Sequence, residues 1–255
     1  MHKNCGVKCC KAELAILDNE VEPMYFSDVN AAISYSNIDT EKGESLLHGE
    51  EVMKIYGDKA SPPNIDNMIT SIINMMKDYN MPDEQIEEAI DNFFKMVIFD
   101  YLFSNTDRHM SNWGMRIYTE PIRGCEFYSM FDNEEILLFG MMEYTIEELM
   151  QLGALEEHVQ SKMFSKMKCR DNSNNTFDEV ITHLLNGKYR NRVLRIINQF
   201  SSEFGEEDLV EILNGFEELS DFRKQGALCT YTTRRRALER IVESCSIDKT
   251  PDVLE

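Results

Sequence analysis

The sequence has no long apolar run, and its N-terminus has no apolar segment. No stretch approaches the roughly 18 consecutive apolar residues that a membrane-spanning helix needs. The first five residues, Met-His-Lys-Asn-Cys, lack the hydrophobic core of a secretory signal. We therefore expect a protein that is neither exported nor inserted in a membrane. With 255 residues, of which 42% are hydrophobic, the chain can bury a core, and we expect one domain or a domain of two lobes.

Positive charge is scarce. The chain has 26 Lys and Arg residues against 46 Asp and Glu residues, which gives a formal net charge of -20. This charge repels nucleic-acid phosphates and anionic lipids, so we expect no binding to bulk nucleic acid and no membrane partner. The local exception is Arg234-Arg235-Arg236 with Arg240, which we interpret as the solvated face of a terminal helix.

The cysteines are not arranged as a disulfide framework. They number seven, an odd count without paired spacing, at positions 5, 9, 10, 125, 169, 229 and 245. A reducing, cytoplasmic location is the simpler expectation. Cys5, Cys9 and Cys10 have His2 beside them, but no second pair of ligands follows at zinc-finger spacing, so a metal site there is disfavoured.

Apolar periodicity predicts a mostly α-helical α+β fold. Steps of three and four residues predict a short helix over 7–18, and strand-like runs follow at 24–26 and 31–37. The helix predicted over 83–103 has a broad apolar stripe and is expected in the core. Two short strands are expected near 113–118 and 125–131. Other helices are expected over 44–56, 65–79, 145–152, 154–168, 176–186, 189–200, 206–219 and 222–245.

Polar residues of a particular kind follow the most apolar helix. Asp107 stands just after it, Asn112 follows five residues later, and Asp132 comes after the predicted strand pair. Phosphoryl transfer needs a carboxylate to orient the attacking hydroxyl and oxygen ligands to hold Mg²⁺ on the phosphates. The spacing lets Asp107 face an acceptor while Asn112 and Asp132 meet at one metal ion. Taken singly, each is an ordinary cap or turn residue.

The same residues carry a family resemblance. Residues 99–113, Phe-Asp-Tyr-Leu-Phe-Ser-Asn-Thr-Asp-Arg-His-Met-Ser-Asn-Trp, resemble the catalytic loop of HipA-like serine/threonine kinases, with its Asn-x-Asp-x-His-x-x-Asn element. Residues 127–133, Phe-Tyr-Ser-Met-Phe-Asp-Asn, are similar to the metal-binding segment of that family. The resemblance implies a serine/threonine kinase that uses ATP and Mg²⁺ and phosphorylates a protein substrate. It implies Asp107 as the catalytic base, His109 as a supporting catalytic-loop residue, and Asn112 and Asp132 as the ligands of the metal and its nucleotide.

The resemblance also implies a domain organisation, a protein-kinase-like C-lobe with a truncated N-lobe. We expect residues 1–37 to be the N-lobe remnant, a helix plus strands leading to the hinge. Residues 38–255 are expected to be the helical C-lobe, with the catalytic loop at 104–113 and the metal segment at 127–133. In this interpretation Glu13 takes the place of the helix glutamate that pairs with a strand lysine, and Arg108 binds a phosphate or pairs with Glu side chains.

The front of a kinase N-lobe is missing from the sequence. No Gly-x-Gly-x-x-Gly loop occurs, and no strand lysine precedes the helix expected over 7–18. Only about 37 residues precede the hinge-like segment, against on the order of 60 for five strands and a helix. Two explanations stay open: the missing strands lie upstream or on a partner chain, or the protein binds nucleotide weakly.

Three functional hypotheses follow from the sequence. The first is a HipA-like kinase, and the second is a pseudokinase that binds a partner protein without catalysis. The third is a lipid kinase, because Asp-Arg-His-x-x-Asn also resembles the loop of phosphatidylinositol kinases. The acidity of the chain opposes docking on anionic membranes and so disfavours the third.

Overall fold

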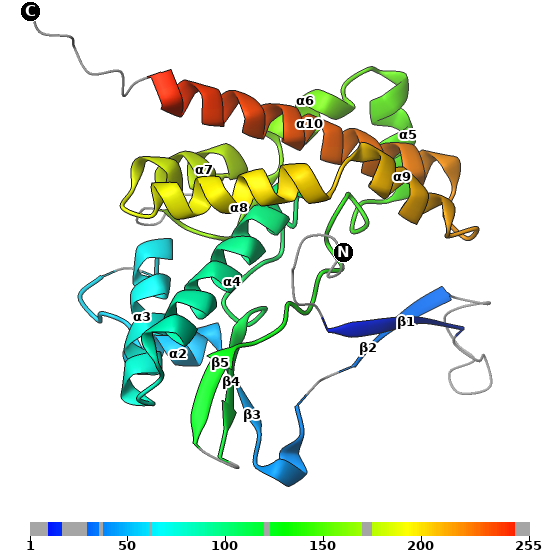
Figure 1. Cartoon of the computed structure of the whole chain (residues 1–255). Helices are drawn as coiled ribbons and strands as arrows, with labels where there is room; N and C mark the ends of the chain where they lie inside the picture. Colours follow the sequence, from blue (N-terminus) through cyan, green and yellow to red (C-terminus); the bar gives the residue numbers. More distant parts are fainter. Residues whose placement is uncertain are drawn as a thin grey trace, which may run out of the picture.

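A computed structural model of the chain describes residues 10–16, 30–35, 38–61, 63–119, 123–169 and 175–247. These residues form a mainly helical body with small antiparallel sheets (Figure 1). The mostly α-helical α+β fold predicted from the sequence is confirmed. The strand predicted at 24–26 lies outside the described residues.

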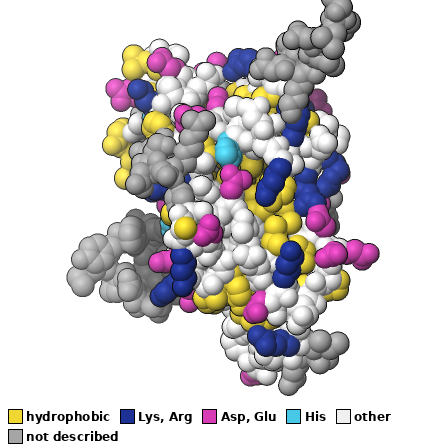
Figure 2. Space-filling view, turned by 90° about the vertical axis from the view of Figure 1, so that its left-hand side faces the viewer, with side chains coloured by type: hydrophobic (Ala, Val, Ile, Leu, Met, Phe, Trp, Pro, Cys, Tyr) yellow, Lys and Arg dark blue, Asp and Glu magenta, His cyan; other side chains and the backbone are white. Residues whose placement is uncertain are grey.

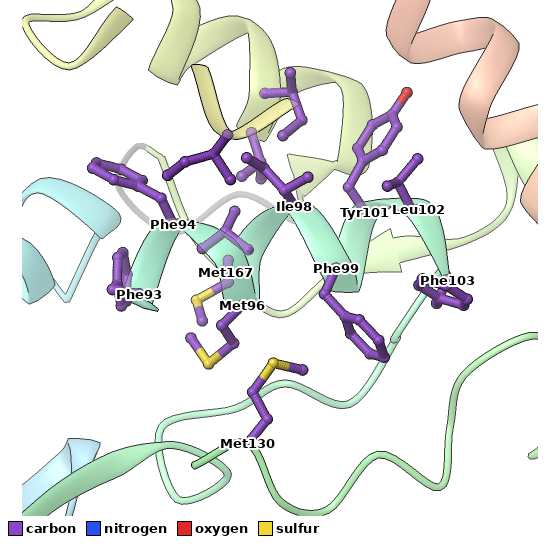
Figure 3. Packing of buried hydrophobic residues seen from close by; sticks show 14 of the residues in the cluster. Phe93, Phe94, Met96, Ile98, Phe99, Tyr101, Leu102, Phe103, Met130 and Met167 are labelled. Carbon is purple, nitrogen blue, oxygen red and sulfur yellow. The ribbon is translucent and has the colours of Figure 1, made fainter. Parts of the chain in front are cut away.

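Helix α4 (Asp83–Leu102) is the centre of the core. Its apolar residues are buried on several sides, because four helices and a strand pack against it, and Figure 3 shows their side chains from close by. Each large apolar side chain buried in this way stabilises the fold by about 1.5–3 kcal/mol. The surrounding elements are α3 (Ile65–Asp78), α7 (Phe177–Asn186), α8 (Arg190–Glu203), α10 (Asp221–Ile247) and β5 (Gly124–Phe127).

Side-chain caps fix where two of these helices begin. The Asn64 side chain accepts a hydrogen bond from the backbone of Asn67 at the start of α3, and Thr176 and Glu179 form a reciprocal capping box at the start of α7. The remaining helices are short and flank the core: α2 (Gly49–Tyr56), α5 (Glu143–Gln151), α6 (Leu155–Ser161) and α9 (Glu206–Asn214). Helix α9 ends earlier than the 206–219 predicted.

A three-stranded sheet lies beside α4. Strand β3 (Ser45–His48) pairs with β4 (Gly114–Tyr118), which pairs with β5, and both pairings are antiparallel. The helix predicted over 44–56 is therefore wrong for its first turn, since residues 45–48 gain backbone partners far away in the sequence. Helix α2 begins at Gly49, where a Cβ atom would lie 2.2 Å from the Trp113 ring, so only glycine fits this close approach.

The helix predicted over 7–18 is wrong for residues 11–16. Strand β1 (Lys11–Ile16) pairs antiparallel with β2 (Asn30–Tyr35), in the register Glu13↔Ile33. The sequence 11–16 alternates as well as it repeats at helical steps, and the partner strand decides between the two. Glu13 consequently lies on a strand and is not a helix glutamate. The backbone N–H of Cys10 donates to Met130 O at 2.9 Å, which joins the start of this hairpin to the segment after β5.

The helix predicted over 154–168 ends early, at Ser161. Residues 163–167 alternate between buried and exposed, and within them β6 (Phe164–Ser165) pairs with β7 (Asn175–Thr176). This alternation turns Phe164 and Lys166 outward and buries their neighbours.

The basic segment of α10 is only partly a solvated face. Arg236 and Arg240 are exposed as expected, but Arg234 is fully buried. Its guanidinium donates to Ser104 Oγ at 2.9 Å and to Val159 O at 2.5 Å, and it lies over the Phe177 ring. Arg234 thus ties the last helix to the end of α4.

The surface adds two observations about charge and membranes. Figure 2 shows one face, on which Lys and Arg side chains lie among Asp and Glu side chains. Within the described ranges, no helix is both long enough and apolar enough to cross a bilayer.

Candidate active site

The candidate site begins where α4 stops. Phe103 caps the helix, and Ser104 takes a left-handed backbone conformation with φ 51°. For a residue with a Cβ atom this conformation is strained, and it persists where surrounding contacts hold it. Here the Ser104 hydroxyl accepts the hydrogen bond from Arg234, and Asn105 N donates back to Asp100 O at 2.9 Å. The chain therefore turns sharply out of the core at a fixed point.

Arg108 organises the interior of the loop. Its side chain is fully buried and forms a two-pronged ion pair with Asp100, with Nε to Oδ2 at 3.0 Å and Nη2 to Oδ1 at 3.1 Å. Nη1 donates to two backbone carbonyls, Asn112 O at 2.6 Å and Phe131 O at 2.7 Å, and Nη2 also donates to Asn133 Oδ1. One guanidinium thus holds the loop 104–113 against the segment 127–133. Its partner is neither a phosphate nor a glutamate, as the sequence had suggested, but an aspartate of α4.

The Asp100 carboxylate depends on this arrangement for its charge. Burial raises the pKa of Asp100, while the charge and hydrogen bonds of Arg108 and the hydrogen bond from Asn105 oppose the rise. The Asn105 amide donates to Asp100 Oδ1 at 2.9 Å. A buried carboxylate is stable only when paired and hydrogen-bonded, and both conditions are met here.

Three of the four residues singled out from the sequence meet in the loop. Asn112 Nδ2 donates to Asp107 O at 2.9 Å and lies 3.4 Å from Asp107 Oδ2. His109 Nε2 lies 3.6 Å from Asp107 Oδ2, and the His109 side chain is 47% exposed. Because the Asn112 amide nitrogen faces Asp107, its oxygen Oδ1 is left as the acceptor on a side chain that is otherwise buried.

Asp132, the fourth, lies on a segment that is held against the same loop. Phe131 O and Asn133 Oδ1, on either side of it, are both held by Arg108. Asp132 itself is exposed and has φ 52°, a conformation that Asp tolerates better than most residues. Tyr128 N donates to Gly114 O at 3.0 Å, which fixes the segment to the first residue of β4.

A brace that the sequence did not indicate holds the outer edge of the loop. His48 Nδ1 lies 2.7 Å from Ser111 O, and the His48 ring contacts Phe131 edge-on. The next two backbone N–H groups, of Gly49 and Glu50, donate to Trp113 O and Met110 O. The start of α2 thus fixes both the loop and the segment that carries Asp132.

Comparison with known proteins identifies the fold that carries this site. The sequence matches no protein-family model and no curated protein. Among solved structures, the chain is similar to the Helicobacter pylori proinflammatory kinase CtkA, with TM-score 0.72 and 14% identity, over 95% of this chain and 84% of that one. It is also similar to a chain of the Shewanella oneidensis toxin–antitoxin complex of HipA, HipB and operator DNA, with TM-score 0.57 and 12% identity, over 100% of this chain and 56% of that one. The chain has a HipA-like kinase fold. The resemblance inferred from residues 99–113 is confirmed at the level of fold.

On this kinase fold, the residues present suit a magnesium ion bound together with a nucleotide. Asn112 Oδ1 and the exposed Asp132 carboxylate are hard oxygen donors, the type that Mg²⁺ prefers. Among the described residues there is no cluster of three or more His, Cys, Asp and Glu side chains that could hold a metal ion by itself. Mg²⁺ in nucleotide sites takes one or two protein ligands and completes its shell with phosphates and water.

Asp100 and Arg108 form the part of this kinase-fold site whose roles were not predicted from the sequence. Asp100 stands among the apolar residues of the 83–103 stripe, where a carboxylate is almost never buried without a partner. An aspartate within this apolar stripe was the sequence signal for a buried cationic partner, and the structure shows that this partner is Arg108, eight residues later.

Proposed function

We propose that this chain is the catalytic lobe of an ATP- and Mg²⁺-dependent kinase that phosphorylates a hydroxyl group of a protein. The proposal rests on one observation: a single buried arginine holds the loop of Asp107 and Asn112 against the segment of Asp132, on a kinase fold. Phosphoryl transfer depends on such positioning more than on covalent chemistry by the protein.

Each residue has a role in the proposed reaction. Asp107 orients the acceptor hydroxyl and takes its proton as the hydroxyl oxygen bonds to the γ-phosphorus and the bond from that phosphorus to the ADP oxygen breaks. Asn112 Oδ1 and the Asp132 carboxylate are the proposed magnesium ligands. Magnesium, when bound, neutralises charge on the phosphates. His109, next to Asp107, supports the loop.

The rest of the nucleotide site is proposed from the domain organisation. We retain residues 1–37 as the remnant of the N-lobe and residues 38–255 as the C-lobe, joined near the hinge after β2. The described strands β1 and β2 contain no glycine-rich loop. A phosphate-binding loop and a strand lysine would come from upstream sequence or from a partner chain, and the reaction would take place in the cytoplasm.

Replacement of the proposed base tests the function. In Asp107→Asn the side chain keeps its shape but cannot accept the proton, so we expect phosphate transfer to a protein substrate to fall on the order of a thousandfold. Transfer is measured with radiolabelled ATP on the longest native form of the protein. The matched control is Asp221→Asn, an exposed aspartate at the start of α10, which should transfer at the wild-type rate. Undiminished transfer by Asp107→Asn contradicts the assignment.

A second candidate is a pseudokinase that binds a partner protein. It is favoured because the sequence contains no Gly-x-Gly-x-x-Gly loop. Calorimetric titration of the same protein with Mg-ATP separates the two. If the protein binds Mg-ATP and transfers phosphate, the kinase assignment is supported. If it does neither, the pseudokinase assignment is supported.

A further inference from the structure

A cleft of about 480 Å³ opens beside Asp107. The loop residues Thr106 and Asp107 form part of its lining. Other residues come from the region after Asp132 and from α6 with the segment that follows it: Glu135, Leu138, Gly140, Met141, His158, Lys162, Met163, Phe164 and Lys166. A hydroxyl group that reaches Asp107 from this side would enter through the cleft.

Basic side chains line part of this cleft. Lys162 and Lys166 are exposed, and neither makes an ion pair with any residue that the structure describes. Half-buried His158 lies one helical turn before Lys162. In a chain of net charge -20, these two lysines place positive charge beside the proposed base, and no ion pair within the described residues occupies them. Glu135 and Asp107 are the acidic groups of the same cleft.

The local structure fixes the backbone positions of these lysines. Lys162 is the C-cap residue directly after α6, and its backbone N–H donates to His158 O at 2.9 Å. Lys166 is turned outward by the alternation of residues 163–167, whose buried members Met163 and Met167 anchor the segment in the core. Phe164, 42% exposed, lies between the two lysines in sequence and offers an apolar surface within the same cleft.

We propose that this cleft binds the polypeptide segment that carries the acceptor hydroxyl, and that Lys162 and Lys166 select segments with Asp or Glu next to that hydroxyl. The inference rests on the proposed function for the identity of the acceptor. Carboxylates on the substrate would pair with the two lysines, Phe164 would contact its apolar atoms, and the hydroxyl would be left beside Asp107. Ion pairs at the surface are individually weak, so we expect the two together to give a preference of about tenfold, which corresponds to about 1.4 kcal/mol.

Binding of fluorescent peptides to the whole chain tests the inference without any phosphate transfer. One peptide carries a serine flanked by Asp and Glu, and its partner has Asn and Gln at the same positions. We expect the acidic peptide to bind about tenfold more tightly in fluorescence anisotropy, and the difference to shrink as salt rises. Lys162→Glu/Lys166→Glu should abolish the preference. The control Lys54→Glu/Lys59→Glu makes the same charge change at two exposed lysines outside the cleft and should keep it.

The outcomes separate this inference from the proposed function. Equal binding of the two peptides by the wild type, or a preference that survives Lys162→Glu/Lys166→Glu, overturns the inference even if phosphate transfer is observed. Tight binding of a phosphoserine peptide alone, without a preference for Asp and Glu, also overturns it. A preference for the acidic peptide that is lost in the double variant supports the cleft assignment, and if the wild type then transfers no phosphate, it is the proposed function that fails. Circular dichroism confirms that each variant is folded.

Discussion

The two sides of the loop 104–113 are built in opposite ways. On the inner side, Asp100, Asn105 and Arg108 are buried, and hydrogen bonds join them to one another and to the backbone. On the outer side, Asp132 and His109 are exposed, Asp107 is partly exposed, and the cleft presents lysines without ion-pair partners among the described residues.

This difference indicates that the inner residues position the loop, whereas the outer residues are available for the reaction. Buried, fully bonded groups hold a loop in one geometry, and breaking one of them leaves an uncompensated charge in the core. Exposed groups contribute little to the free energy of folding and are available to a ligand. We therefore expect substitutions on the inner side to lower stability and substitutions on the outer side to lower activity alone.

The substitution Asp132→Asn tests the outer side of the loop and has the largest expected effect. The Asp132 side chain is exposed and has no role in packing, so the variant should unfold at the wild-type temperature. As a magnesium ligand the carboxylate would contribute several kcal/mol to the transition state, which corresponds to a loss of transfer on the order of a thousandfold. Radiolabelled transfer and a thermal melt are measured on one preparation. A lowered melting temperature with full activity would make Asp132 a structural turn residue.

Arg108→Met tests the inner side. The substitution leaves the Asp100 carboxylate buried without its charge partner, and we expect it to lower the free energy of unfolding by about 3–5 kcal/mol. Urea denaturation monitored by circular dichroism gives this value. The control is Arg195→Met, because Arg195 pairs with Asp91 at the surface, where about 0–1 kcal/mol is expected.

A second replacement makes the test of Arg108 specific. Arg108→Met combined with Asp100→Leu removes both charges, and part of the lost stability should return because no unpaired carboxylate remains. If the double variant is as unstable as Arg108→Met, the buried pair is not the source of the loss.

Whether the partners of a segment are local or distant in the sequence explains which elements could be predicted from the sequence. The helices at 65–79 and 83–103 were predicted closely, since a long apolar stripe specifies its own structure. Residues 11–16 and 45–48 were predicted as helix and form strands, because their partners lie at 30–35 and 114–117 and no local pattern identifies them. Short strands depend on such tertiary pairing more than on propensity.

The candidate site follows the same rule. Asp107, His109 and Asn112 lie in one continuous loop, so their proximity was predictable from the sequence. The segment of Asp132 was expected beside this loop, but the contacts of Arg108 that hold the segment there were not predicted. His48 was missed altogether, because its contact with Ser111 O crosses 63 residues and depends on a strand predicted as helix.

The smallest expected effect lies on the outer wall of the cleft, at His158. Burial, and then the charge of Lys162, lower the pKa of His158 below its ordinary value. Lys166, Glu135 and Asp107 are the other charged groups of the cleft. In Lys162→Met one repulsion is removed while the burial stays, so the pKa of His158 should rise part of the way back. The sign follows because loss of a nearby positive charge favours the protonated ring.

The pKa of His158 is measured from the pH dependence of its ring proton shift, assigned with His158→Gln. Lys54→Met, outside the cleft, should leave it unchanged. A bound acidic peptide should also raise it, because carboxylates near the ring favour the imidazolium. If Lys162→Met leaves the pKa of His158 unchanged, the charge of Lys162 does not act on His158 within the cleft. The contrast between a basic outer side of the loop and its buried inner side would then not hold.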